Sequence, residues 1–468
     1  MPTVIETIAQ WAANSPVFNA RCRELAHHAI TDTIGCMIAG RDDTATQAVR
    51  RAFIDSIMAD DQAGSSLIGG GRALPAVAAC LNATAAHALD YDDNFRPAIS
   101  HPSAVLVPAL LAVAQARSAT GRQLVDAYLI GLEAQALVGE GVNPSHYTLG
   151  WHATSTVGVI GSACGVAWLM GLDEGGIARA MSLATSMAAG PKGQFGTLAK
   201  PLHAGLAARN AVEAAQLAGT EMSGRLDILE CPQGFMELYG GTGALGWGAL
   251  REGRRLPNAP HSIESEGVLP KRHPCCGSTH LVVDAVLALK AQHVFTAQEV
   301  VAVETRVGIA NARNLAYPEP NDEMQARFSM PYCVALALAQ PRLSLADFTP
   351  AAIRRPELRA LLPLVSMHHY SVEQEATCST PLPHWVGIQL RDGRLLEAER
   401  RHARGSLSDP FDEQDRQGKF ADCCLAFPPS RCNKLYWNLS QLDEMGDLKW
   451  LYAAFRSLRP RSELGERA

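Results

Sequence analysis

The residues best suited to chemistry in this chain are concentrated between two apolar, helix-like stretches, in residues 85–114 (AAHALDYDDNFRPAISHPSAVLVPALLAVA). This segment brings carboxylates and imidazoles into close succession: His87, Asp90, Asp92, Asp93 and His101. Burying ionisable groups costs free energy unless they are paired, so clusters of this kind are often kept for function. The alternative interpretation is that the three aspartates only cap a helix end and lie in solvent. From this segment alone the two interpretations are equally good.

Four other segments place histidine, lysine or tyrosine among residues that carry little charge. They are SHYTLGWHATS with Tyr147 and His152, QFGTLAKPLHAGLAARN with Lys200 and His203, LPKRHPCCGSTH with Lys271 and Arg272, and NLAYPEP with Tyr317. An acidic protein that gathers cationic side chains in its least charged segments suits a pocket for an anionic substrate, and a polycarboxylate fits this pattern.

Lys200 is the most informative of these residues, because Phe195, Leu198 and Leu202 surround it and Pro201 is placed to start a helix. Desolvation favours the neutral form of a lysine, which would make Lys200 a base. The alternative is a lysine whose stem packs on apolar surface while its amine reaches water. The histidines and tyrosines of the four segments, each taken alone, also have an ordinary interpretation as hydrogen-bonded core or rim residues.

The overall composition excludes several classes of protein. The chain has 468 residues, a formal net charge of −6 and a pI of about 6.2. A general nucleic-acid-binding protein should be basic or carry a basic stripe, so we expect no nucleic-acid partner. The residues MPTVIETIAQ show no basic region followed by an apolar one. We therefore expect no signal peptide and a cytoplasmic protein with reduced thiols.

The cysteine and aspartate patterns do not match familiar metal sites. None of the twelve cysteines forms a CxxC pair, and the spacing expected of cubane iron–sulfur ligands is missing. The acids and histidines of residues 87–101 could supply hard ligands, but DYDDN is not an EF-hand loop and the chain has no HExxH motif. Metal binding is the rival chemical interpretation of this segment, and we expect neither a metal nor a cofactor.

One uncharged stretch, residues 153–172, is long enough to span a bilayer and contains a GxxxG pattern. It is rich in alanine, glycine, serine and threonine, has few large aliphatic residues and lacks a basic flank. We therefore expect a tightly packed buried helix and no membrane partner.

Periodicity predicts a mainly α protein. Helical patterns dominate up to about residue 265 and return after residue 405, with helices expected at residues 25–39, 75–87, 103–117, 121–139, 157–170, 174–188, 201–218, 411–426 and 440–458. Between them, residues 299–308 predict a strand, and residues 385–399 predict a hairpin that turns at Asp392-Gly393. Helices are also expected at residues 278–292 and 329–339. We expect a large all-α helical domain built from both chain ends (1–266 and 401–468) and a smaller inserted α/β domain (267–400).

Taken together, the motifs HALDYDD…HPSAVLVPALLA, GWHATSTVG, GTLAKPLHAGLAARN, KRHPCC…H and RFSMPYCVALAL resemble the MmgE/PrpD family. They occur in the family's order and cover most of the chain. The family comprises 2-methylcitrate dehydratases, cis-aconitate decarboxylases and iminodisuccinate epimerases. The resemblance implies a helical domain with a smaller lid domain, a homodimer, and no iron–sulfur cluster. It also places several residues on active-site positions of the family: Asp90, His101, His152, Lys200, Lys271 and Tyr317.

The chemistry implied by this resemblance is proton transfer at a carbon next to a carboxylate. We predict that Lys200 and Tyr147, which resembles a tyrosine of epimerase-like members, transfer the proton. His101 is then the acid and Asp90 orients it, while Asp92 and Asp93 only cap and solvate the loop. The predicted substrate-binding residues are His152, Lys271, Arg272, His203 and Tyr317.

Three reactions are consistent with these roles. Our first prediction is a cofactor-independent dehydratase of a citrate-like polycarboxylate such as 2-methylcitrate. The alternatives are an epimerase of an imino- or amino-dicarboxylate and a decarboxylase of the cis-aconitate type. A carboxylate-binding protein without activity is the non-enzymatic alternative.

Overall fold

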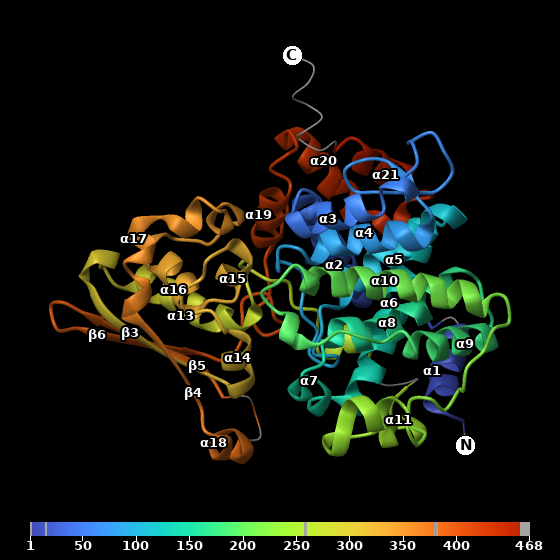
Figure 1. Ribbon diagram of the computed structural model, residues 1–468, viewed down its shortest axis with the longest axis horizontal. Helices are drawn as coiled ribbons and strands as arrows, with labels where there is room; N and C mark the ends of the chain where they lie inside the picture. The colour runs from blue at the N-terminus through green and yellow to red at the C-terminus, as the bar shows by residue number, and fades with distance from the viewer. Residues whose placement is uncertain (1, 15, 257–259, 379, 381, 459–468) are drawn as a thin grey trace.

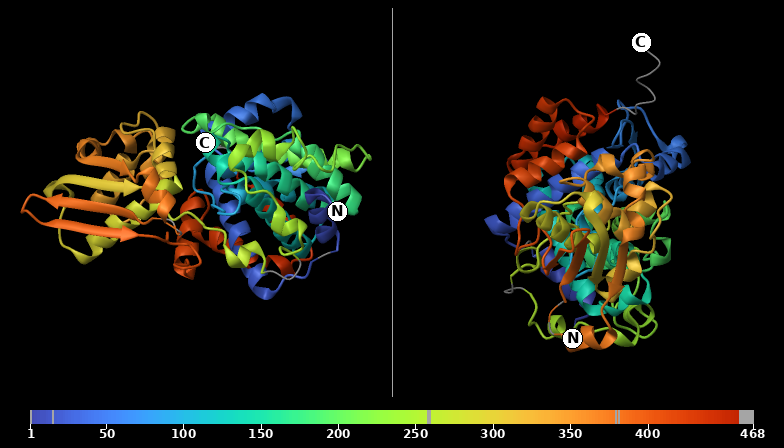
Figure 2. Two further views of the ribbon diagram at one scale, coloured as in Figure 1. Left: turned by 90° about the horizontal axis from the view of Figure 1, so that it is seen from below. Right: turned by 90° about the vertical axis from the view of Figure 1, so that its left-hand side faces the viewer.

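The computed structural model describes residues 2–14, 16–256, 260–378, 380 and 382–458. The secondary structure is mainly helical, as the sequence predicts. A four-stranded sheet lies at one end of the long axis of the molecule, beside a large group of helices (Figure 1; Figure 2, left). Among the described residues, no helix combines the length and the apolar character needed to cross a bilayer.

Up to residue 265 the described part of the chain forms twelve α-helices: α1 (Val4–Ala13), α2 (Ala20–Gly40), α3 (Thr44–Ala52), α4 (Pro75–His87), α5 (Pro102–Arg117), α6 (Gly121–Val142), α7 (Ser145–Leu149), α8 (Ala153–Leu169), α9 (Glu174–Thr185), α10 (Ala199–Ala218), α11 (Gly248–Arg251) and α12 (Ser262–Ser265). Pro75 and Pro102 each occupy a first-turn position, where the missing N–H costs nothing. Asp90, Asp92 and Asp93 thus lie in the loop between α4 and α5. Residues 60–74, outside these helices, contain only the short paired strands β1 (Ser65–Ser66) and β2 (Arg72–Ala73).

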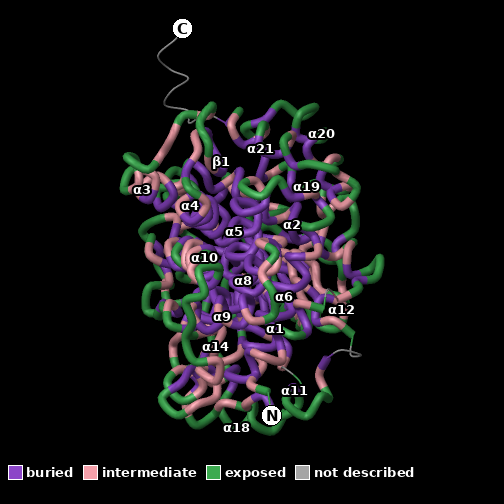
Figure 3. The backbone as a smooth tube through the Cα atoms, turned by 90° about the vertical axis from the view of Figure 1, so that its right-hand side faces the viewer, coloured by how far each residue is buried: buried purple, intermediate pink, exposed green. Residues whose placement is uncertain are grey.

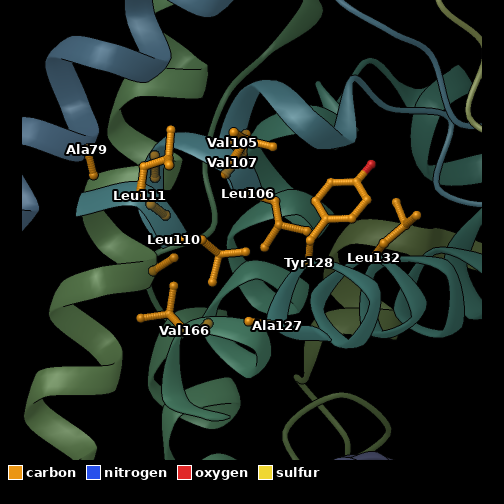
Figure 4. Packing of buried hydrophobic residues seen from close by; sticks show 14 of the residues in the cluster. Ala79, Val105, Leu106, Val107, Leu110, Leu111, Ala127, Tyr128, Leu132 and Val166 are labelled. Atoms are coloured by element: carbon orange, nitrogen blue, oxygen red, sulfur yellow. The ribbon is translucent and has the colours of Figure 1, made fainter. Parts of the chain in front are cut away.

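The main hydrophobic core is formed by α4, α5, α6, α8 and α10, which pack on one another in the centre of the helical part. Figure 3 shows these helices as almost wholly buried, with exposed residues confined to the periphery. Leu106 and Leu110 of α5 lie against Tyr128 and Leu132 of α6 and Val166 of α8 (Figure 4). Such dense packing holds the ends of these helices, and the loops between them, in one arrangement.

The uncharged GxxxG stretch is the buried helix α8, as predicted. A β-carbon on Gly161 would lie 2.4 Å from the backbone nitrogen of Gln135 in α6, and one on Gly165 would lie 2.7 Å from the carbonyl oxygen of Ala127. Both contacts are too short for a side chain. The two glycines therefore serve close packing between α6 and α8.

The sheet belongs to a second part of the chain, whose elements are α13 (Gly277–Gln292), β3 (Val300–Val307), α14 (Ile309–Asn314), α15 (Glu323–Arg327), α16 (Met330–Ala339), α17 (Pro356–Arg359), β4 (Val365–His369), α18 (Val372–Thr377), β5 (His384–Leu390) and β6 (Leu395–Arg400). The strand order is β4-β3-β5-β6, with β4 parallel to β3 and the other pairs antiparallel. The predicted strand and hairpin are confirmed. The sequence did not reveal β4, because it is a short edge strand with mostly unburied residues.

The two largest hydrophobic clusters of the described residues are distinct, and a third, small one consists of Cys36, Tyr91 and Cys423. Of the two largest, one draws on residues 4–263 and 420–458, and the other on residues 275–396. The division of the chain into domains at residues 267 and 400 stays a prediction.

The last described helices are α19 (Glu413–Cys423), α20 (Pro429–Ser440) and α21 (Lys449–Arg456), and α19 and α20 pack on α2. The helix predicted for residues 440–458 is wrong over its first half, because α20 ends at Ser440 and α21 begins only at Lys449. Pro429 lies in the first turn of α20, where proline favours the start of a helix, but the apolar pattern predicted no helix over these residues.

Candidate active site

Asp90 lies at the centre of the candidate site, between two lysines that are distant from it in the sequence. The Nζ of Lys200 forms an ion pair with Asp90 Oδ1. The Nζ of Lys271 lies 3.1 Å from the same oxygen and also donates a hydrogen bond of 2.9 Å to the Asp90 carbonyl oxygen. All three side chains are buried. The Lys200 side chain is only 2% exposed, ammonium group included, so the alternative of a lysine whose amine extends into solvent is excluded.

Local backbone geometry sets the position of these groups. Asp90 has φ of +51°, a left-handed conformation that is unfavourable for residues other than glycine. Such strain costs on the order of 1–3 kcal/mol and is found where the surroundings hold it in place. Lys271 donates a hydrogen bond to the Asp90 carbonyl oxygen and Lys200 forms an ion pair with the Asp90 carboxylate, so both the backbone and the side chain of Asp90 are held in place.

Asp90, Lys200 and Lys271 together carry one net positive charge at the cavity, and the nearby anion of Asp92 does not line it. Burial by itself would raise the pKa of Asp90, but the ammonium groups of Lys200 and Lys271 hold that pKa well below its usual range. Burial would lower the pKa of Lys271, but the charges of Asp90 and Asp92 raise it. A carboxylate between two cations is ionised, and the second cation remains available for an anionic ligand.

A cavity of about 360 Å³ opens onto this group. Five of the predicted site residues line it: Asp90, His101, Tyr147, Lys200 and Lys271. The walls come from two parts of the chain. Residues of α13 and α14 and Phe328 lie on one side, and the loop between α4 and α5 and the start of α10 lie on the other. The volume suits a small molecule of the size of a citrate-like acid.

The four other predicted residues lie outside the wall of this cavity. Arg272 donates from Nη1 to Asp284 Oδ1 at 2.9 Å, and Tyr317 donates its hydroxyl to the Phe195 carbonyl oxygen at 3.0 Å. His152 and His203 contact each other through their Nδ1 atoms at 3.1 Å. The ring of His152 meets Phe195, which does line the cavity, at 5.0 Å between centroids. Their contact with substrate stays a prediction.

His101 is held by the loop that carries it. Its Nδ1 lies 2.8 Å from the carbonyl oxygen of Asp93 and 3.5 Å from Asp92 Oδ2. The neighbouring carboxylate that faces His101 Nδ1 is therefore Asp92, whereas Asp90 is bonded to the two lysines. Asp92 and Asp93 are both buried, so the expectation that they solvate the loop is wrong. The expected capping is found for Asp93, whose Oδ1 accepts a hydrogen bond from the Ser103 backbone N–H in the first turn of α5.

Burial and the charge of Lys271 hold the pKa of His101 well below its usual range. The imidazole is therefore neutral at neutral pH while the cavity is empty of charge, and it can act as an acid only after it has gained a proton.

Tyr147 faces the cavity with its phenol protonated. Burial raises the pKa of Tyr147 above its usual range, and its hydroxyl oxygen accepts a hydrogen bond of 3.1 Å from Asn314 Nδ2. The Nζ of Lys192 lies 3.5 Å from the centroid of the Tyr147 ring. A cation over the face of an aromatic ring is attracted to it and restricts its orientation.

Several lining residues escaped the sequence analysis. They are Asn94, Ser278, Asn311, Asn314 and Phe328, to which Lys192 can be added as a neighbour of Tyr147. Most are uncharged polar residues of a kind common in loops, so their type carries no signal without the fold. Ser278 could have been found from its place at the expected start of a helix, next to the motif that contains Lys271.

Three side chains, one at the end of α4 and two in the loop that follows, are close enough to hold a metal ion. Ligand atoms of His87, Asp92 and His101 lie within 4.8 Å of one another. The contacts themselves are those of hydrogen bonds, with His87 Nδ1 at 2.7 Å from Asp92 Oδ2. This hydrogen bond joins His87 to Asp92, while His87 Nε2 and Asp92 Oδ1 are buried without a hydrogen-bond partner among the described residues.

Comparisons with known proteins agree in their family. The model of the MmgE/PrpD N-terminal domain matches residues 6–247, and that of the MmgE/PrpD C-terminal domain matches residues 273–435. The chain is 28% identical over 405 residues to cis-aconitate decarboxylase of Homo sapiens, which covers 84% of this chain and 81% of that protein. It is 28% identical over 363 residues to cis-aconitate decarboxylase of Mus musculus, covering 75% of this chain and 72% of that protein.

Proposed function

The chain belongs to the MmgE/PrpD family, and from this premise we propose that it is a lyase acting on a citrate-like polycarboxylate. The observation that carries the proposal is the buried group of Asp90, Lys200 and Lys271 at the end of a cavity of about 360 Å³. Two buried cations around one carboxylate leave a net positive charge. Such a site suits a substrate with several carboxylates, and it stabilises the charge that develops when a proton leaves the neighbouring carbon.

In the proposed reaction, Lys200 removes a proton from the carbon next to a substrate carboxylate. The Lys200 ammonium group first loses its proton to solvent, so that a neutral amine faces the substrate while Asp90 stays ionised beside Lys271. Lys271 stabilises the enolate-like charge, and the protonated phenol of Tyr147 lines the same cavity, where it can donate a hydrogen bond to that charge. His101 delivers a proton to the departing hydroxyl group, which leaves as water.

A second candidate is decarboxylation of an aconitate-like acid, and the named relatives favour it, because two of them are cis-aconitate decarboxylases. The same cations would stabilise the carbanion formed when carbon dioxide leaves. The two reactions differ in the leaving group and not in the charge that the site must hold.

We also propose that residues 267–400 act as a lid. Ser278, Asn314 and Phe328 of this part line the cavity opposite Asp90 and Lys200. A movement of one part against the other would open the cavity and admit substrate, and closure would exclude water from the two lysines.

The proposal is tested by incubating the full chain in heavy water with 2-methylcitrate, citrate, cis-aconitate and an amino-dicarboxylate, each followed by proton NMR. A dehydratase forms an alkene from one of the two citrates, and a decarboxylase releases carbon dioxide from cis-aconitate with deuterium incorporated. Deuterium exchange with inversion of an imino- or amino-dicarboxylate, and no elimination, would instead establish an epimerase. Binding without exchange of any carbon-bound proton would refute catalysis.

A further inference from the structure

Behind His101, on the side away from the cavity, lies a pair of buried side chains that the proposed reaction has not used. His87 is the last residue of α4, and Asp92 follows in the loop. Their side chains are both 0% exposed. Asp92 Oδ2 lies 2.7 Å from His87 Nδ1 and 3.5 Å from His101 Nδ1, so one carboxylate oxygen faces two imidazoles. The rings of His87 and His101 are 4.7 Å apart between centroids.

Hydrogen-bond chemistry defines the state of both rings. An ionised carboxylate and a carbonyl oxygen only accept hydrogen bonds, so the Nδ1 atoms that face Asp92 and the Asp93 carbonyl must carry hydrogens. In a neutral imidazole the other nitrogen, Nε2, then has a free lone pair. Because Nδ1 of His101 is engaged on the loop side and the residue lines the cavity, Nε2 is the atom left for substrate.

We propose that Asp92 is a positioning residue that makes His101 take up a proton when a polycarboxylate binds, and that His87 anchors Asp92 for this purpose. This inference rests on the proposed function and assigns the source of its acid. The proton comes from solvent, binds at Nε2 of His101, and later leaves with the hydroxyl group as water. The proton taken from carbon passes to Lys200 and returns to solvent, so the reaction is balanced.

The charges around His101 account for this behaviour. The titratable or charged groups that face it are His87, Asp90, Asp92, Asp93, His152, Lys200 and Lys271, with Tyr147, Cys276 and His280 across the cavity. In the free protein burial and the ammonium charge of Lys271 depress the pKa of His101, while Asp92 raises it. Substrate carboxylates offset the effect of the two lysines. The charge of Asp92 then favours the imidazolium.

The pKa values of the two partners agree with these assignments. Burial lowers the pKa of His87 despite its carboxylate neighbour, so that His87 remains a neutral donor. Burial would raise the pKa of Asp92, but the hydrogen bond from His87 and the charge of Lys271 lower it, so that Asp92 remains an anion.

The experiment is calorimetric titration of the full-length protein at pH 7 with propane-1,2,3-tricarboxylate, which has no hydroxyl group to lose. Repeating it in buffers of different ionisation enthalpy counts the protons taken up on binding. We expect uptake of about one proton in the wild type and less than half of that in Asp92→Asn. Asp93→Asn is the matched control. Burial raises the pKa of Asp93 to about 8, so this carboxyl group is already mostly uncharged at pH 7, and proton uptake should persist.

Kinetics on the substrate identified above supply a second readout. Asp92→Asn should lower kcat at least tenfold and change KM less than threefold, because it alters the acid and not the lysines. If Asp92→Asn does not fold, His87 carries the same test. His87→Asn keeps a donor for Asp92 and should retain the uptake, whereas His87→Leu should reduce it.

The outcomes are distinct. A wild type that binds the tricarboxylate without proton uptake, or an Asp92→Asn variant with undiminished uptake, overturns the inference and leaves the proposed function intact. A wild type that binds no tricarboxylate and turns over no polycarboxylate refutes the proposed function, and the inference with it.

Discussion

Replacing Lys200 by methionine is the most direct test of the buried charge group. The substitution keeps most of the side-chain volume but removes the base and one of the two cations that hold Asp90. Loss of a general base typically lowers the rate by about 10²–10⁴-fold. We therefore expect kcat/KM of Lys200→Met to fall by at least about 10²-fold, measured by NMR on the identified substrate.

The same variant should be less stable. Breaking a buried ion pair costs about 3–5 kcal/mol when the remaining charge has no other partner. Here Lys271 still faces Asp90 at 3.1 Å, so the loss should lie below that range, at roughly 1–3 kcal/mol in urea unfolding. The double variant Asp90→Asn/Lys200→Met removes both charges and should recover part of this stability but none of the activity. Such non-additivity is the signature of a direct interaction.

Lys449→Met is a matched control, because the side chain of Lys449 is 89% exposed and its pairing contributes little. It should leave activity and stability unchanged. Activity of Lys200→Met within tenfold of the wild type would refute the assignment of the base. Additive stability changes in the three Asp90 and Lys200 variants would refute the interaction between these two residues.

The stability of the protein in acid should depend on Asp90. The pKa of Asp90 is depressed in the folded protein, so its contribution to stability is present above the unfolded pKa of about 4 and is lost as the pH falls below it. As the pH falls from about 6 to about 3, Asp90→Asn should therefore lose less stability than the wild type, as measured by unfolding curves at each pH.

Three further outcomes are expected. Lys271→Met should lower kcat/KM by at least about 10²-fold. Arg272→Met should have a smaller effect, because the Arg272 guanidinium is paired with Asp284 and does not line the cavity. Equal losses in the two variants would contradict this placement. Burial raises the pKa of Asp93 to about 8, so stability falls as the pH rises from the unfolded value of about 4 to 8, and the stability of Asp93→Asn relative to wild type should grow over that interval in parallel urea titrations. Dialysis against a chelator should leave turnover unchanged, and a loss reversed by added metal would instead indicate a metal at the loop between α4 and α5.

The sequence by itself determined the mainly helical architecture and most of its elements. The small-residue pattern of residues 153–172 predicted a buried helix, and its two glycines indeed sit where a side chain would collide with α6. The strand at residues 300–307 and the hairpin after it followed from alternation and from Asp392-Gly393. These features are local in sequence, because periodicity and turn chemistry act within a few residues. The family motifs likewise pointed to Asp90, His101, Tyr147, Lys200 and Lys271, all of which line one cavity.

Only the tertiary structure decided how those residues are paired. Asp90 and Lys200 are separated by 110 residues, and nothing in either segment shows that they share a buried ion pair. The sequence suggested that Asp90 orients His101 and that Asp92 is solvated, whereas packing of α4 and α5 turns Asp92 inward, between His87 and His101. Arg272 and Lys271 are neighbours in the chain, yet one faces Asp284 and the other Asp90. A motif specifies which chemical groups are present, but their partners depend on helix packing across long sequence separations, because a buried charge must meet its counter-ion in space.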